Sequence, residues 1–96
     1  MSSSILVIDV GTSGLRAAVV RPDATITAMH YREFAPSSPF AGLVEFDATE
    51  MARLVLEVAQ ASLAEAGAVA AVGITTQRAS TILWDRSTGI PLGPAL

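Results

Sequence analysis

A carboxylate, two hydroxyls and two glycines stand close together near the start of the chain. An apolar run ends at Asp9, and the turn that follows contains Gly11, Thr12, Ser13 and Gly14. Glycine lets the backbone approach a phosphate closely and adopt a positive φ, and successive N–H groups in a turn bind anions. An ionised carboxylate suits a hydrated Mg²⁺. The stretch predicts a phosphate-binding hairpin, and an ordinary turn between two strands explains the same residues equally well.

Two well-known nucleotide motifs are absent from this stretch. A P-loop needs G-x-x-x-x-G-K-[ST], and the chain contains no Lys, because all six of its basic residues are Arg. The dinucleotide pattern G-x-G-x-x-G is missing as well. Arg16 follows Gly14 closely and is the nearest cation that could reach a phosphate or pair with an acid.

A second polar group follows a later apolar run. That run ends at Thr75, and the next residues are Thr76, Gln77, Arg78 and Ala79. Arg offers a planar fork of donors to sugar oxygens or a phosphate, and the hydroxyls and the amide add donors and acceptors for a polyhydroxylated ligand. Taken alone, this segment is better explained as a polar loop whose Arg lies in solvent.

Short apolar runs rich in β-branched residues predict the strands that position these groups. The runs span residues 5–9, 15–20, 25–34, 69–75 and 80–84. The first three follow one another with only turns between them, so we expect an antiparallel meander. Pro, Ser and Gly residues predict a loop at 35–46, and Asp and Gly predict a turn at 85–89.

Residues 48–66 predict a helix, since they contain neither Gly nor Pro. Asp47 and Glu50 form a capping-box pattern at its start, and Gly67 is a natural C-terminal stop. Residues at helical spacing form one largely apolar face: Met51, Leu54, Val55, Val58, Ala59, Ser62 and Leu63. One helix covers one face of a sheet, so another face or an edge is expected to be unprotected.

Four further side chains are interpreted as structural. His30 is the only histidine and has no second metal ligand near it in the sequence. Trp84 predicts a packed aromatic residue. Glu57 and Glu65 are expected to lie on a solvated helix face, and not to form a catalytic pair.

The composition excludes several classes of protein. The 96 residues are 51% hydrophobic, enough for one small domain or a piece of a larger one. A formal net charge of −3 without basic clusters argues against nucleic acid as a partner. No run approaches the length of a membrane span, and the start of the chain lacks a basic leader. With no Cys, these features fit a reducing compartment and predict a cytoplasmic protein.

Three segments together resemble one known family. Residues 9–16, Asp-Val-Gly-Thr-Ser-Gly-Leu-Arg, resemble the first phosphate motif of the actin, chaperone and sugar-kinase superfamily. Residues 73–78 and 84–92 resemble the FGGY carbohydrate kinases, and the glycerol kinase branch most closely. Residues 44–47 are similar to the segment before that family's helix. The resemblance covers nearly the whole chain in the same order and spacing.

The resemblance implies an α/β fold: part of a ribonuclease H-like core of the actin-like ATPase type. Residues 1–96 would form part of the N-terminal domain of a two-domain kinase, with a phosphate hairpin at 5–20, a helix at 48–66 and a substrate segment at 73–80. The whole enzyme would transfer the γ-phosphoryl group of ATP to a hydroxyl of a sugar or polyol. The family's catalytic Asp lies outside these residues, so this chain alone is expected to be inactive.

The same resemblance assigns roles by position. Asp9 would bind the hydrated Mg²⁺, and the ATP-binding residues would be Asp9, Gly11, Thr12, Ser13, Gly14 and Arg16. Gln77, Arg78 and Ala79 would contact the substrate. Glycerol kinases have Glu where this chain has Ala79, and a lost hydroxyl acceptor favours a different polyol or sugar.

Two other functions fit parts of the sequence. An open sheet could make the chain a non-catalytic module that self-associates into a homo-oligomer. Another ATPase of actin-like fold would share only the hairpin at 9–16, and residues 75–78 and 84–92 argue against it. For the kinase, the expected partners are a small sugar or polyol and the remainder of the kinase chain.

Overall fold

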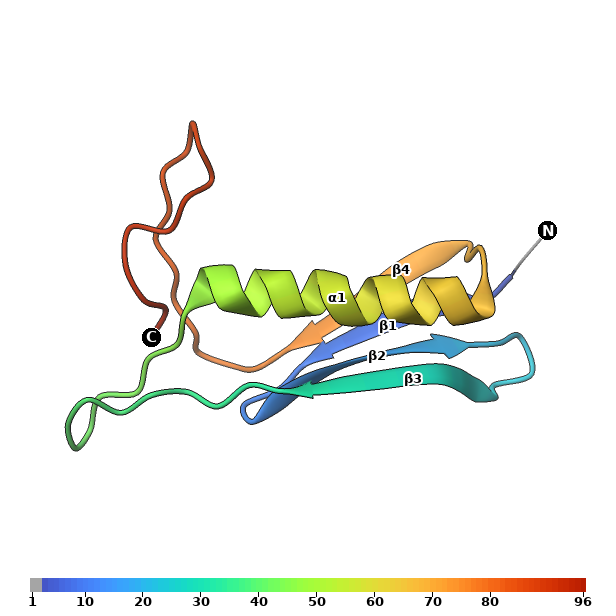
Figure 1. Ribbon diagram of the computed structural model, residues 1–96, viewed down its shortest axis with the longest axis horizontal. Helices are drawn as coiled ribbons and strands as arrows, with labels where there is room; N and C mark the ends of the chain where they lie inside the picture. Colours follow the sequence, from blue (N-terminus) through green and yellow to red (C-terminus); the bar gives the residue numbers. More distant parts are fainter. Residues whose placement is uncertain (1–2) are drawn as a thin grey trace.

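The computed structural model describes residues 3–96, which form a four-stranded sheet covered by a helix (Figure 1). The elements are β1 (Ile5–Val10), β2 (Gly14–Val20), β3 (Ile26–Glu33), α1 (Ala48–Ala66) and β4 (Ala71–Thr76). The strand order is β3-β2-β1-β4, with β1 antiparallel to β2 and parallel to β4. The predicted antiparallel meander is confirmed. The strand predicted at residues 69–75 is β4, which begins two residues later and ends one residue later than expected.

The helix has the predicted ends. The Glu50 N–H donates to Asp47 Oδ1 at 3.1 Å, so Asp47 is the N-cap. The N–H of Gly67 donates to the carbonyl of Leu63 at 2.8 Å, and its φ of +84° is one that glycine adopts without strain. The Glu50 carboxylate does not complete a capping box, because it pairs with Arg53 at 2.6 Å and this pairing lowers its pKa.

The predicted apolar face of α1 packs on one face of the sheet. The buried core contains Leu6, Ile8, Val10, Leu15, Ala17, Val19, Ala28, Leu54, Val58 and Ala59. Ser62 is also buried, and its hydroxyl donates a hydrogen bond to the carbonyl of Ala28 at 2.7 Å. Ala28 lies at an irregularity in the β2–β3 pairing and has a φ of +53°. The serine therefore satisfies a carbonyl where the strand ladder is interrupted.

Acidic side chains of α1 also join the helix to β3. Glu57 lies 2.9 Å from Arg32, and Glu65 lies 3.6 Å from His30. The interpretation of His30 as structural is consistent with this position. The expected solvated face is confirmed, since the side chains of Glu57 and Glu65 are 40% and 59% exposed, and each has a basic side chain of the sheet as a neighbour.

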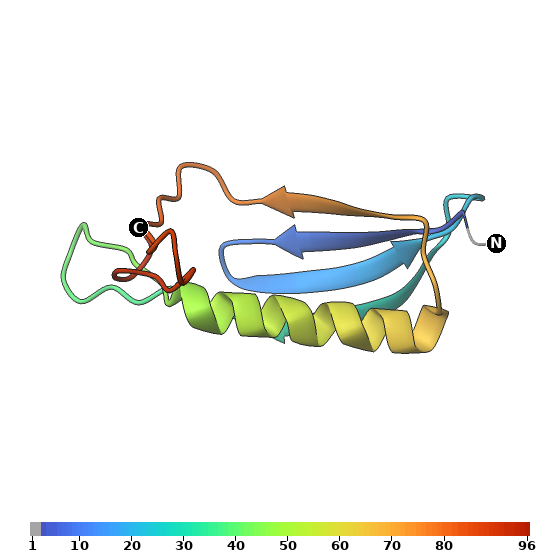
Figure 2. The ribbon, with the colours of Figure 1, turned by 90° about the horizontal axis from the view of Figure 1, so that it is seen from above.

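β4 is paired on one side but covered on neither face. All six of its residues are exposed, because α1 lies over β1, β2 and β3 and not over β4 (Figure 2). The expectation of an unprotected face or edge is confirmed in this strand. Within residues 3–96, no helix has the length and apolar character needed to cross a membrane.

The predicted strand at residues 80–84 is wrong. The segment forms one arm of a narrow hairpin with a single bridge between Trp84 and Pro91. Two backbone hydrogen bonds of 2.8 Å flank this bridge, from Asp85 to the carbonyl of Ile90 and from Leu92 to the carbonyl of Leu83. Trp84 is 61% exposed, which also corrects its expected role as a packed aromatic. The predicted turn at 85–89 is confirmed, and hydrogen bonds from Ser87 and Thr88 lower the pKa of Asp85 at its start.

Candidate functional site

The parallel pairing of β1 and β4 brings the two polar groups of the sequence together. Asp9 lies opposite Thr75, and Val10 lies opposite Thr76. The carboxyl ends of parallel neighbours meet at one edge of a sheet, which is where α/β proteins bind ligands. The turn at residues 11–13 and the loop at residues 77–80 therefore leave the sheet side by side.

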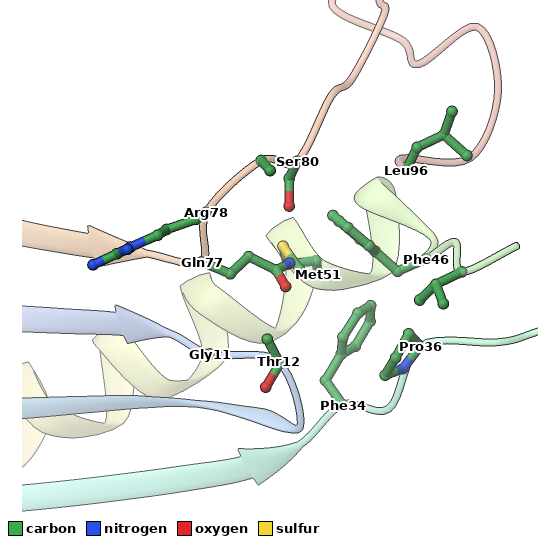
Figure 3. Close-up of a pocket in the computed structure, with 12 residues that line it drawn as sticks. Gly11, Thr12, Phe34, Pro36, Phe46, Met51, Gln77, Arg78, Ser80 and Leu96 are labelled. Carbon is green, nitrogen blue, oxygen red and sulfur yellow. The ribbon is translucent and has the colours of Figure 1, made fainter. Parts of the chain in front are cut away.

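These two segments line a pocket of about 210 Å³ (Figure 3). Five of the predicted site residues contribute to its wall: Gly11, Thr12, Gln77, Arg78 and Ala79. Ser80 also lines it and lies in the predicted substrate segment, whereas no motif of the sequence indicated the other lining residues, which are Phe34, Pro36, Val44, Phe46, Met51 and Leu96. A signal for some of them was present, because Phe34 and Phe46 flank the predicted loop that must return from β3 to the start of the helix.

The side chains of the substrate segment point in different directions. Gln77 extends toward Met51 inside the pocket, and Arg78 points away from it (Figure 3). Ala79 has a φ of +58°, which is uncommon for a residue with a Cβ. This left-handed residue turns the chain between Arg78 and Ser80. The predicted substrate residues are thus adjacent, but only Gln77 directs a long polar side chain into the pocket.

Asp9 and Arg16 lie on a different surface from the pocket. They face each other across β1 and β2, and Tyr31 faces Arg16 across β2 and β3. Since side chains alternate along a strand and Val10 and Leu15 point toward α1, this row lies on the opposite face of the sheet. The side chains of Asp9 and Arg16 are therefore separated from the pocket by the thickness of the sheet, whereas Gly11 and Thr12 line it.

Arg16 has an aromatic neighbour on this face of the sheet. Its guanidinium carbon lies 5.4 Å from the centre of the Tyr31 ring, which is a cation–π arrangement. Asp9 is exposed beside it. No group of three metal-ligating side chains occurs within residues 3–96. One carboxylate is nevertheless a suitable partner for Mg²⁺, which usually keeps several waters and binds one or two carboxylates together with substrate phosphates.

The turn of the hairpin is shaped by packing. Gly11 donates its N–H to the carbonyl of Gly14 at 2.9 Å, and the carbonyl of Ser13 accepts the N–H of Phe34 at 3.0 Å. Neither hairpin glycine has a positive φ, so this part of the expectation is wrong. Gly14 is needed for another reason: a Cβ at this position would overlap the ring of Tyr31.

Gly14→Ala should therefore push the Tyr31 ring away from Arg16 and lower the free energy of unfolding by about 1–3 kcal/mol. Gly73→Ala is the matched control, since a Cβ there would meet no atom within 4 Å. Its effect should be neutral or stabilising by up to about 1 kcal/mol. Urea denaturation measures both changes. Adding Tyr31→Ala to Gly14→Ala should remove the steric cost, and equal destabilisation by the two alanines would contradict the packing argument.

The fold has close counterparts among solved structures. The xylulose kinase of Rhodospirillum rubrum matches 96% of this chain with a TM-score of 0.80 and 27% identity, and the match covers 20% of that kinase. Plasmodium falciparum glycerol kinase, solved with ADP, matches 99% of this chain with a TM-score of 0.84 and 24% identity, again over 20% of its length. The structure is thus a partial α/β domain of the actin-like ATPase fold.

Sequence comparison places the chain more narrowly. The sequence model of the FGGY family of carbohydrate kinases, N-terminal domain, matches residues 4–96. The glycerol kinase of Methylobacterium nodulans is 44% identical over 93 residues, which cover 93% of this chain and 18% of that enzyme. The glycerol kinase of Bordetella pertussis is 45% identical over 96 residues, 96% of this chain and 19% of that enzyme. The chain belongs to the FGGY family of carbohydrate kinases, and it spans about a fifth of the length of these relatives.

Proposed function

We propose that this chain provides the phosphate-binding hairpin and one wall of the substrate site of an ATP-dependent carbohydrate kinase. The kinase transfers the γ-phosphoryl group of ATP to a hydroxyl of a sugar or polyol. The observation that supports this most strongly is the β1–β4 register, because it joins the turn at residues 11–13 and the loop at residues 77–80 in one pocket. Residues 1–96 then form part of the N-terminal kinase domain.

The hairpin is proposed to bind the phosphates. The backbone and hydroxyls of Thr12 and Ser13 donate hydrogen bonds to phosphate oxygens, Gly11 allows the close approach, and Gly14 closes the turn against Tyr31. Arg16 lies on the nucleotide side and neutralises charge. Asp9 would hold a hydrated Mg²⁺, which would supply charge neutralisation at the phosphates. Catalysis of phosphoryl transfer is mostly positioning and electrostatic stabilisation, which such groups supply.

The loop after β4 is proposed to bind the carbohydrate through Gln77, Arg78 and the backbone around Ala79. Arg78 points outward in this structure, so its contact with substrate requires a different rotamer. No Asp or Glu side chain lines the pocket among the residues that the structure describes there. A pocket without that strong acceptor favours a substrate other than glycerol, in line with Ala79 replacing the Glu of glycerol kinases.

A chimera tests this function directly. Residues 4–96 would replace the matching segment of the glycerol kinase of Agrobacterium fabrum, which is 43% identical over 93 residues. We expect the chimera to consume ATP only when a sugar or polyol is present, measured by ADP release against a panel of both. The 96-residue chain alone should show no such turnover. A chimera that melts cooperatively but phosphorylates no carbohydrate would overturn the proposal.

A further inference from the structure

The pocket has two chemically different sides. One side is apolar and formed by Phe34, Phe46 and Met51. The two phenylalanine rings pack edge to face, with centroids 6.2 Å apart and planes at 81°. Phe46 is 9% exposed and is fixed by backbone hydrogen bonds of 2.9 Å in both directions with Ala95. We call these three side chains the apolar floor, and their packing makes it a preformed surface.

The other side of the pocket is polar and largely uncharged. Gln77 extends its carboxamide over the apolar floor toward Met51, and Thr12 lines the same side of the pocket (Figure 3). Arg78 is the one charged residue of the lining, and its guanidinium points outward. An amide has both a donor and an acceptor and therefore suits a hydroxyl, which also has both. The pocket thus offers hydrogen bonds on one side and dispersion contacts on the other.

We propose that Gln77 orients a ring-form sugar whose C–H face packs on the apolar floor. This deepens the proposed function and rests on it, because the pocket is the substrate site only if the chain is part of a kinase. A sugar ring has an extended C–H face and a rim of hydroxyls. An open-chain polyol presents a hydroxyl on each carbon and has no comparable rigid face. The volume of about 210 Å³ is below the roughly 300–1,000 Å³ of pockets for drug-sized ligands, so the pocket fits a small molecule.

Binding to the 96-residue chain tests the inference without any phosphoryl transfer. The probes are ribose, its open-chain counterpart ribitol, and glycerol, and the readout is the shift of backbone amide signals by NMR. We expect ribose to bind about five- to tenfold more tightly than the other two, a difference of about 1–1.4 kcal/mol. Shifts should be largest at residues 11–12 and 77–80. Equal affinities for ribose and ribitol would overturn the role of the apolar floor.

Three variants separate the parts of the pocket. Gln77→Leu should weaken ribose binding about tenfold, since the sugar hydroxyl loses its hydrogen-bonding partner in a partly buried site. Gln60→Leu is the matched control on the exposed side of α1 and should leave the affinity unchanged. Phe34→Leu keeps an apolar side chain but removes a ring, and should reduce the preference for ribose over ribitol.

The outcomes distinguish this inference from the proposed function. Equal losses of ribose affinity in Gln77→Leu and Gln60→Leu would overturn the orienting role of Gln77. Absence of saturable binding by all three probes would overturn the inference as a whole. Neither result tests the binding of phosphate by the hairpin, which the chimera tests separately through ATP turnover.

Discussion

Replacing Asp9 with Asn should lower the kcat of the chimeric kinase roughly 10- to 100-fold, the usual loss when an outer ligand of a catalytic metal is changed. Asn has the shape of Asp but no negative charge, so the hairpin keeps its register while the attraction for Mg²⁺ is lost. The KM for the carbohydrate should change little, because Asp9 lies on the face of the sheet opposite the pocket. The Mg²⁺ concentration that gives half-maximal rate should rise.

Asp23→Asn is the control for this experiment. Asp23 lies in the turn between β2 and β3, at the other end of the hairpin, and its carboxylate accepts hydrogen bonds from Thr25. Its removal should change kcat by less than about twofold. Equal losses in kcat and in carbohydrate affinity for Asp9→Asn would contradict the metal role and indicate that the carboxylate positions the substrate.

Replacing Leu15 with Ala should cost about 2–5 kcal/mol of stability, as for other large-to-small changes in a core. Leu15 is 1% exposed and lies at the start of β2, directly opposite Val10 of β1. The total free energy of unfolding of native proteins is about 5–15 kcal/mol, so this single change removes a large share of it. Urea denaturation followed by circular dichroism measures the loss as a lower midpoint at an unchanged slope.

Leu56→Ala is the matched control, because Leu56 is 61% exposed on α1. Its effect should be within about 0.5 kcal/mol. Both variants lose the same leucine side chain, so the difference between their free energies of unfolding measures the effect of burial. Similar losses at the two positions would show that the hairpin end of the sheet contributes less to the core than its burial indicates.

Local signals in the sequence were sufficient for most of the fold. The ends of the helix follow from Asp47 and Gly67, whose cap interactions depend only on residues within a few positions. The meander follows from apolar runs separated by short turns. These features involve short-range chemistry, so periodicity and residue type predict them well.

Features that depend on distant contacts were not predicted. The apolar floor joins Phe34 and Phe46 through a ring contact that no sequence pattern encodes. Trp84 resembles a core residue by type, but in this structure it is 61% exposed. The outward direction of Arg78 depends on the backbone turn at Ala79, which is not a residue type that indicates a positive φ. Each of these is decided by tertiary packing.

The β1–β4 pairing also affects the order of events during folding. Ile5 and Ala71 pair although they lie more than sixty residues apart, whereas β1, β2 and β3 are joined by short turns. Closing a long segment costs more entropy than closing a hairpin, and non-local pairings form slowly. We therefore expect the meander to form before β4 joins it. The pocket takes its walls from both sides of that pairing, so the chain gains its binding site only in the last step of folding.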